Sequence, residues 1–322
     1  TTLFSYEYPE DISKTFLSKL ERKESVLYCY TASMETTNRM PNSAPTSSIF
    51  NPKLLNLSLN ALNVSEEEKT IIYSLHHFAK FRLAIYSINY FENNENLGIR
   101  IRVKNENNAG YISACSDIFV PFKPFKLNKD DYVVFEKVIR KINAVIPSII
   151  PGYQITITES YPKNIQSATN GVDFVLMSDR NGITVPLAYE SNGIKKIISL
   201  ISGMIEAYSN EGHLLVVDEL DSGIFEYLLG EIAYAFDNFS RGQLIFTCHN
   251  MRVLEKISHK NAFFTTLDPF NAFVKITNVK ESNNLRDLYY KYIANGLKGE
   301  MKFYDMVDTS KLINSLNMEV DS

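Results

Sequence analysis

The chain has 322 residues, of which 45% are hydrophobic, and its formal net charge at pH 7 is −4. This composition predicts a globular protein with a proper core, and a pI near 5.8 excludes a global attraction to nucleic acid. Cys29, Cys115 and Cys248 stand in no metal-ligand spacing, which argues against a disulfide scaffold, and no apolar run reaches the roughly 18 residues of a membrane span. We therefore expect a cytoplasmic protein that does not contact a membrane.

The first part of the chain predicts one long helix among short strands and loops. Ser65 and Glu68 are the ends of a capping box, and the amphipathic residues that follow predict a helix through about Phe91. A helix of that length suits a lid, a dimerisation arm or a platform for a partner. The shorter predicted elements are strands at residues 3–8, 25–31 and 99–103 and a helix that begins at Asp11 or Ser13 and ends at Leu20.

Turn-rich residues between Asn105 and Asn128 mark the predicted domain boundary. We expect residues 1–115 to form part of an N-terminal lobe with the helical arm or lid, and residues 116–322 to form a C-terminal lobe. The C-terminal lobe opens with extended chain and a helix at 130–145 that Pro147 ends. Strands are then predicted at 153–159, 172–178 and 183–187, with a hairpin turn at Asn181-Gly182 between the last two.

After this hairpin the pattern alternates between helices and strands. Such alternation indicates an α/β fold with a mainly parallel sheet flanked by helices. The predicted helices are at 194–208, 224–236 and 252–257, and the predicted strands are at 214–217, 243–247 and 262–266. A strand at 273–276 is expected to pair antiparallel with the last of these, and helices at 285–294 and 299–316 finish the chain.

Two acidic residues follow the strand predicted at 214–217. That strand is a continuous apolar run, which is typical of a strand buried on both faces of a parallel sheet, and Asp218 and Glu219 come at its carboxyl end, where such sheets bind ligands. There, Asp218 suits a magnesium ion held through its water shell, and Glu219 suits a general base that polarises an attacking water. The alternative is a surface turn or a helix start, where acids are also common.

Ser191, Asn192 and Gly193 lie between a strand and the start of a helix. Free amides and the positive end of the helix dipole converge at such a point, so a phosphate can dock against Ser191 and the Gly193 backbone. The alternative is an ordinary N-cap, because Ser and Asn are common there in any case. Lys195 and Lys196 fall in the first helical turn, where we expect charged side chains to be solvated, with contact to an anion as the alternative.

His249 and Asp221 complete the set of candidate site residues. His249 follows the strand at 243–247 and therefore lies at the same sheet edge as Asp218 and Glu219, where it can donate a hydrogen bond to a terminal phosphate. The alternatives are that His249 is merely the neighbour of a helix N-cap or a half-buried polar filler. Asp221 is expected to cap the helix that follows it, with contact to a second subunit as the alternative.

Three ordered segments carry a family resemblance. Glu190 to Lys196, Val216 to Asp221 and Phe246 to Asn250 resemble the signature, the Walker B motif with D-loop, and the H-loop of ABC-type ATPases. The chain looks most similar to the RecF/SMC/OLD-like group, and within it to the AAA-family ATPases of bacterial antiphage and abortive-infection systems. The resemblance covers roughly Ile149 to Tyr290, and Asn192 in place of a glycine and Phe225 in place of an aspartate suggest a divergent branch.

The resemblance implies an ABC-ATPase-like head in which two protomers sandwich two ATP molecules. Ser191 and Gly193 would then contact the γ-phosphate of nucleotide held by the opposite subunit's phosphate loop, and Asn192 and Asp221 are the other expected cofactor-binding residues. Asp218, through Mg²⁺, and Glu219 and His249 would serve the nucleotide on their own side. The G-x-x-x-x-G-K-[ST] phosphate loop, or Walker A motif, does not occur in the sequence. Since the chain opens on Thr1, we expect that loop to lie outside this segment.

The leading hypothesis is therefore an ATPase that dimerises around ATP to control an effector protein, such as a nuclease, or to act on DNA, in bacterial antiphage defence. One alternative is a nucleotide-sensing or scaffold module that holds a partner protein and hydrolyses nothing. Another is a DNA-repair ATPase. No carboxylate cluster resembling a Toprim nuclease follows the ATPase-like segments, so DNA cleavage by this chain is not expected.

Overall fold

The chain divides into two compact units. The computed structural model describes residues 6–7, 11–12, 65–87, 96–101, 116–121, 125–127, 129–159, 172–268, 270–276, 284–295 and 308–316. The first unit consists of Thr1–Ile85 with Ile101–Ser116, and the second of Tyr86–Arg100 with Asp117–Ser322. The backbone thus enters the second unit at Tyr86, returns to the first and leaves it again after Ser116.

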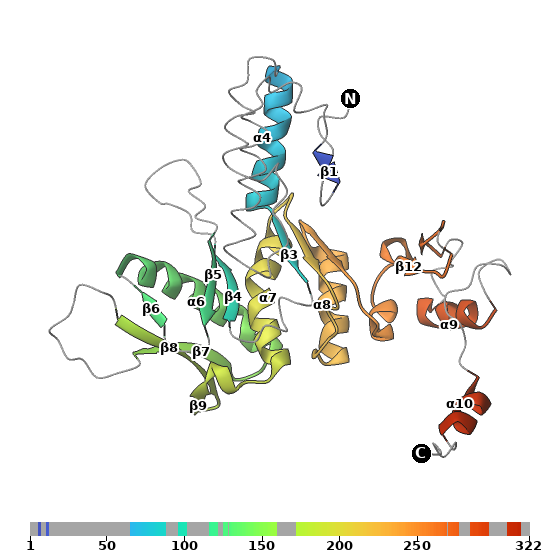
Figure 1. Ribbon diagram of the computed structural model, residues 1–322. Helices are drawn as coiled ribbons and strands as arrows, with labels where there is room; N and C mark the ends of the chain where they lie inside the picture. The colour runs from blue at the N-terminus through green and yellow to red at the C-terminus, as the bar shows by residue number, and fades with distance from the viewer. Residues whose placement is uncertain are drawn as a thin grey trace, which may run out of the picture. The chain divides into compact units, whose positions relative to one another are not determined.

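The main helix of the first unit is α4 (Glu66–Phe81), shown in blue in Figure 1. Its predicted capping box is confirmed, because Ser65 Oγ accepts a hydrogen bond from the Glu68 amide at 3.3 Å. The Glu68 carboxylate in turn accepts from the Ser65 amide at 3.0 Å. Two of the helix's first free amides are satisfied in this way, which explains why the helix starts here.

The predicted extension of this helix to Phe91 is wrong. The helix ends at Phe81, and the residues after Arg82 form strand β3 (Leu83–Tyr86). Ala84 and Tyr86 are buried while Ile85 between them is exposed, which is the two-residue period of a strand. The apolar residues Leu83–Tyr86 would also suit a helix, but burial of alternate side chains makes them a strand.

Two short strands, β1 (Tyr6–Glu7) and β2 (Asp11–Ile12), form an antiparallel pair near the N-terminus. Asp11 therefore lies in a strand opposite Glu7. The prediction that Asp11 starts a helix is wrong, because its backbone is extended and pairs with the neighbouring strand. The alternative start at Ser13, the helix through Leu20 and the strand at 25–31 lie outside the described residues.

An antiparallel sheet forms one part of the second unit. Its strands are β6 (Phe125–Leu127), β7 (Tyr153–Glu159), β8 (Val172–Arg180) and β9 (Ile183–Pro186). They are ordered β6-β8-β7, and β9 also pairs with β8. The hairpin predicted between β8 and β9 is confirmed: Asn181 and Gly182 have φ values of 53° and 85°, which two-residue hairpin turns require.

Helix α6 (Lys129–Ile149) packs on β7. The Asn143 side chain holds the two together, since it accepts from the Ile155 amide at 2.8 Å and donates to the Ile155 carbonyl at 2.7 Å. The helix passes through Pro147, where we predicted its end. A proline in the last turn removes a single hydrogen bond, and the fully buried Ile146 keeps that turn in place. A separate two-stranded sheet consists of β4 (Asn96–Ile101) and β5 (Ser116–Pro121).

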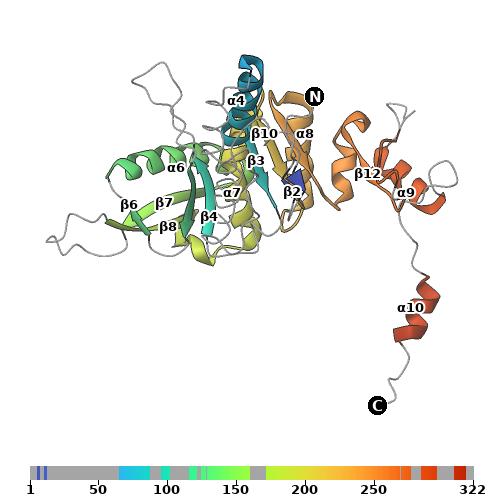
Figure 2. The ribbon, with the colours of Figure 1, turned by 45° about the horizontal axis from the view of Figure 1, so that its top comes forward.

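The parallel pair of strands β10 (Leu214–Val217) and β11 (Gln243–Phe246) carries the candidate site. Leu214 lies opposite Gln243 and Val217 opposite Phe246. Helices α7 (Asn192–Ser209) and α8 (Glu226–Phe239) flank this pair, as Figure 1 and Figure 2 show from two directions. The protein is therefore a mixed α/β fold with a parallel sheet flanked by helices, as predicted.

Tyr86, the last residue of β3, joins the same sheet, whose order is β11-β10-β3. Its carbonyl accepts from the Asp218 amide at 2.8 Å, and its hydroxyl donates to the Ser199 carbonyl in α7 at 3.4 Å. Leu215 and Val217 are fully buried, as their continuous apolar run predicts. β10 is thus a central strand, and the chain that leaves its carboxyl end is firmly placed.

The C-terminal part of the second unit consists of short elements. These are η4 (Met251–Glu255), η5 (His259–Asn261), β12 (Phe264–Thr265), β13 (Phe273–Val274), α9 (Leu285–Asn295) and α10 (Thr309–Leu316). β12 and β13 pair antiparallel, as predicted. Ala262, Phe264, Ile276 and Leu285 form a small buried core. Within the described ranges, no helix is long and apolar enough to cross a bilayer.

Candidate functional site

Polar residues from two neighbouring strands meet at the carboxyl edge of the parallel pair. Asp218 and Glu219 follow β10 directly, and Thr247 follows β11. Thr247 Oγ1 donates to Asp218 Oδ1 at 2.6 Å and accepts from the Glu219 amide at 2.7 Å. Sequence reasoning did not single out Thr247. The signal that was available is its position, since a hydroxyl immediately after a parallel strand lies beside the residues that follow the next strand.

Glu219 has an unusual backbone conformation. Its φ is 48°, in the left-handed region, and Asn181 is the other described non-glycine residue with a positive φ. Next to it, Leu220 is fully buried and its amide donates to the Thr247 carbonyl at 2.9 Å. The buried Leu220 therefore anchors the turn in the core. Asp218 is exposed and Glu219 is half-buried.

The start of α7 lies against the turn that follows β10. Ser191 is the N-cap of the helix, with its Oγ accepting from the Ile194 amide at 3.3 Å, and both Ser191 and Asn192 are exposed. A Cβ on Gly193 would lie 2.0 Å from the Gly223 carbonyl oxygen, so the close approach requires a glycine. The structure thus brings Ser191, Asn192 and Gly193 next to the turn of Asp218 to Gly223.

Lys196 is buried, which contradicts the prediction of a solvated side chain. Its exposed fraction is 5%, and Nζ donates to the Glu219 carbonyl and, at 3.1 Å, to the Ser222 carbonyl. Burial lowers the pKa of Lys196, and the nearby carboxylates of Asp221, Glu219 and Asp218 partly offset that effect. The signal that we missed is the helix phase. Lys196 stands on the buried stripe of α7 with Leu200, Gly203 and Ala207.

Asp221 connects the two loops of the site. Its Oδ2 accepts from the His249 amide at 2.9 Å, and its carbonyl accepts from the Ile224 amide at 3.1 Å. The prediction that Asp221 caps the next helix is wrong, because α8 starts at Glu226 and its N-cap is Phe225, without a side-chain bond. The turns that follow β10 occupy residues 218–223, which moves the helix start beyond the reach of Asp221.

His249 is exposed on the loop between β11 and η4. It therefore lies at the same sheet edge as Asp218 and Glu219. Its neighbour Cys248 is a half-buried free thiol. Burial, together with the Asp221 charge, raises the pKa of Cys248 to about 11, so the thiol stays protonated at neutral pH.

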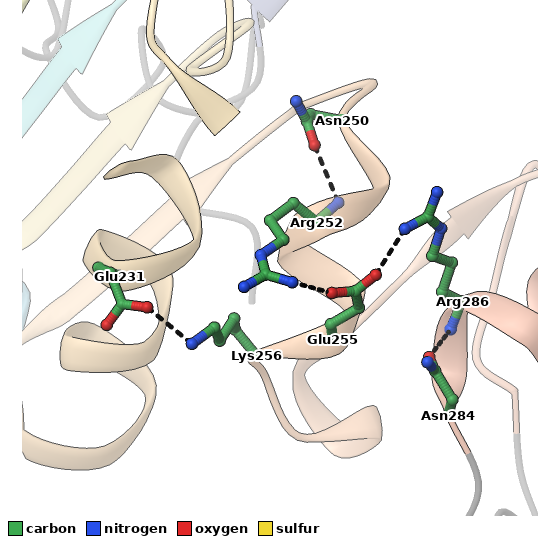
Figure 3. A network of polar contacts seen from close by, with 7 residues as sticks. All are labelled: Glu231, Asn250, Arg252, Glu255, Lys256, Asn284 and Arg286. Atoms are coloured by element: carbon green, nitrogen blue, oxygen red, sulfur yellow. Dashed lines mark hydrogen bonds and ion pairs between the residues drawn. The ribbon is translucent and has the colours of Figure 1, made fainter. Parts of the chain in front are cut away.

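A network of charged groups anchors the segment after His249, as Figure 3 shows. Glu255 in η4 accepts from Arg252 in the same short helix and from Arg286 in α9, the latter at 2.6 Å. Lys256 donates to Glu231 in α8 at 2.7 Å. The hydrogen bond from Arg286 is the main cause of a lowered pKa of Glu255. The loop that carries His249 is therefore tied to both α8 and α9.

The donor set at this edge suits magnesium only in a particular way. Among the described residues, no group of three or more His, Cys, Asp or Glu side chains is placed to hold a metal ion alone. Mg²⁺ is commonly held by one or two carboxylates together with waters and substrate phosphates. The exposed Asp218 carboxylate fits that mode, in which waters and phosphates would supply the remaining ligands.

Comparisons with known proteins return solved structures alone. No family model matches the sequence, and no curated protein matches it. Similar structures include an SMC head bound to the C-terminal winged-helix domain of ScpA, at 16% identity over 37% of this chain and 37% of that chain, with a TM-score of 0.28. An SMC head with coiled coil and joint from Pyrococcus yayanosii shares 16% identity over 40% of this chain and 26% of that chain, with a TM-score of 0.29.

An SMC head from Pyrococcus furiosus, with an extended coiled coil and bound to the C-terminal domain of ScpA, shares 11% identity. That match covers 94% of this chain and 55% of the other, with a TM-score of 0.30. The chain thus spans about half or less of the length of these structures. At such TM-scores, the likeness does not bear on the function of the site.

Proposed function

We propose that this chain carries the signature, Walker B, D-loop and H-loop side of an ABC-type ATPase head, which hydrolyses ATP to ADP and phosphate. One observation carries the proposal. The carboxylate pair Asp218-Glu219, the His249 loop and the exposed start of α7 at Ser191 meet at one edge of the parallel sheet. Sheets of this kind bind ligands at that edge, and phosphates bind at helix N-termini.

Each side chain has a role that its position supports. Asp218 holds Mg²⁺, which neutralises charge on the phosphates when it is bound. Glu219 accepts the proton of the attacking water, and the Thr247 hydroxyl keeps Asp218 and the Glu219 backbone in fixed relation. The His249 imidazole donates to the terminal phosphate. The backbone amide of His249 donates to Asp221 Oδ2, which links His249 to the turn that carries Glu219.

The exposed start of α7 faces outward in this proposal and meets nucleotide held by a second copy of the chain. Ser191, Asn192 and Gly193 offer a hydroxyl, an amide group and a backbone N–H there, and Asp221 lies in the turn whose Gly223 meets Gly193. Pairing of two heads around ATP then controls a partner protein, such as a nuclease, or acts on DNA. The antiphage role is part of the proposal and rests on the sequence resemblance alone.

The test uses the full polypeptide that the gene encodes. Glu219→Gln should lower kcat for ATP by about 100-fold or more, because a general base contributes roughly 10²–10⁴ in rate. ATP should still bind, since the amide keeps the size of the side chain. Glu211→Gln is the matched control, because Glu211 is an exposed carboxylate before the amino end of β10 and should leave turnover unchanged.

Two results would overturn the proposal. Undiminished turnover in Glu219→Gln would show that the Asp218-Glu219 turn is not the hydrolytic site. Binding of ATP with no turnover in the unaltered protein would support the sensing or scaffold module instead.

A further inference from the structure

Lys196 is the buried cation that the proposed roles do not use. It is the one buried lysine or arginine among the residues whose surroundings the structure describes. A buried ammonium group is unfavourable unless its protons find acceptors. Here the acceptors are two main-chain carbonyls, those of Glu219 and Ser222, in the turn that follows β10. The sequence has therefore placed a costly charge under the candidate catalytic turn.

The backbone of Glu219 is held from both sides. Its amide donates to Thr247 Oγ1 at 2.7 Å, and its carbonyl accepts both from Lys196 Nζ and, at 3.1 Å, from the Ser222 amide. These contacts surround a residue whose φ of 48° is uncommon for glutamate. Backbone angles fix the direction of the Cα–Cβ bond and restrict the allowed rotamers, so the same contacts set the direction in which the Glu219 side chain leaves the backbone.

Lys196 also belongs to the first turns of α7, whose start carries Ser191 and Gly193. Gly193 approaches Gly223 so closely that a Cβ would meet the Gly223 carbonyl at 2.0 Å. The helix start and the Glu219 turn therefore contact each other at two points, the Gly193–Gly223 approach and the Lys196 hydrogen bonds. A shift of the start of α7 therefore requires a shift of the Glu219 turn, because the two backbone segments are closely packed.

We propose that Lys196 is a positioning residue, which clamps the turn of residues 219–222 to α7, keeps Glu219 in its left-handed conformation and so aims its carboxylate. The role of that carboxylate in hydrolysis rests on the proposed function, whereas the clamp itself does not. Through the clamp, a ligand bound at the start of α7 influences Glu219 of the same chain. Lysine suits this task because one ammonium donates to both carbonyls at once.

Amide hydrogen exchange on the full chain tests the clamp without any assumption about ATP. Lys196→Met keeps the length and apolar stem of the side chain but donates no hydrogen bond. We expect amides of residues 219–222 to exchange about tenfold faster or more, because the local opening free energy falls, while β10 and α8 keep their protection. Lys69→Met removes another partly covered lysine, bonded to Glu66 at 2.8 Å in α4, and should leave residues 219–222 unchanged.

Unchanged exchange at residues 219–222 in Lys196→Met would overturn the clamp. If Lys196→Met does not fold, Lys196→Gln is the second variant, because its amide group can still donate to one of the two carbonyls. Amide exchange at residues 219–222 should then increase, but by less than the roughly tenfold expected for the loss of both hydrogen bonds. Exchange in Lys196→Gln equal to that of the unaltered chain would likewise contradict the proposal.

Kinetics then separate positioning from general structural support. Lys196→Met should lower kcat for ATP by about 10- to 100-fold with little change in KM, since it misplaces a group that acts in the transition state. In a Glu219→Gln background the same substitution should cause no further loss, because the group it aims is already gone. An equal further loss in that background would assign Lys196 a merely structural role. If the unaltered protein does not hydrolyse ATP, the proposed function fails, and hydrogen exchange still decides the clamp.

Discussion

Glu219 combines a proposed catalytic carboxylate with a backbone conformation that glutamate seldom adopts. Its φ of 48° places the Cβ close to the following carbonyl oxygen, which costs about 1–2 kcal/mol for a residue with a side chain. Hydrogen bonds from Lys196 and to Thr247 offset this strain. Strained backbone of this kind persists where the surroundings over-determine it, and it gathers at functional sites.

This strain predicts an inverted order of stability between two substitutions. Glu219→Gly should be more stable than Glu219→Ala by about 1 kcal/mol, because glycine adopts positive φ freely whereas alanine does not. Both variants lack the carboxylate, so the difference reports the backbone alone. The free energy of unfolding in urea measures it.

The control is Glu226, an exposed residue in the first turn of α8. There, glycine should be less stable than alanine by up to about 1 kcal/mol, which is the usual order in a helix. If Glu219 showed the same order as Glu226, the residue would carry no left-handed strain.

Residues of the site differ in how far the sequence predicts them. Asp218 and Glu219 could be placed because a continuous apolar strand leads directly to them. His249 could be placed at the same edge because a second such strand precedes it. Lys196 was misjudged because its charge was given more weight than its helix phase. Thr247 was missed because its role comes from pairing between strands that are far apart in the sequence.

At the scale of elements, local signals predicted starts and turns better than ends. The capping box at Ser65 and the Asn181-Gly182 turn use chemistry within four residues, and both are confirmed. The end of α4 at Phe81 depends on alternate burial in Leu83–Tyr86, which no local rule reveals. Element boundaries that depend on hydrogen bonds between near neighbours can therefore be predicted from the sequence. Boundaries that depend on burial by distant segments cannot.

The charged network in Figure 3 gives a pH-dependent prediction at this scale. Hydrogen bonding from Arg286 lowers the pKa of Glu255 below its ordinary value of 4.5 in the folded protein. Such a group contributes stability that is fully present above 4.5 and is lost as the pH falls through the lowered value. Because the partners are partly exposed, Glu255→Gln should reduce the free energy of unfolding by only about 0.5–1 kcal/mol at pH 7.

Urea unfolding of Glu255→Gln and the unaltered protein at pH 7 and pH 3 checks this prediction. The difference at pH 7 should shrink at pH 3, because pH 3 lies below the ordinary pKa of 4.5 and the unfolded chain then binds a proton at Glu255. Glu211→Gln removes one partner of an exposed pair with Arg241 and should change stability at neither pH. A Glu255→Gln difference that is equal at both pH values would exclude the ionised carboxylate as its source.

For the whole molecule, the proposal requires two copies of the chain. In that proposal, Asp218, Glu219 and His249 serve one nucleotide, and the exposed start of α7 meets the nucleotide of the second copy. Ser191 and Asn192 are exposed although α7 is otherwise deeply buried along one face. The need for a second copy rests on the family resemblance, which assigns Ser191 and Gly193 to nucleotide held by the opposite subunit.

Assembly should therefore depend on ATP and on Ser191. In Glu219→Gln full-length protein, Mg²⁺ and ATP should increase the sedimentation coefficient to that of a paired species, because ATP is held without turnover. Ser191→Arg should prevent this increase, since the larger side chain occupies the space of the phosphate. Ser209→Arg alters an exposed serine at the other end of the same helix and should assemble normally.

Removal of Mg²⁺ with a chelator should reverse assembly in both the Glu219→Gln and the Ser209→Arg proteins. Equal assembly of the Ser191→Arg and Ser209→Arg variants, each in the Glu219→Gln background, would show that the start of α7 does not meet nucleotide of a second copy.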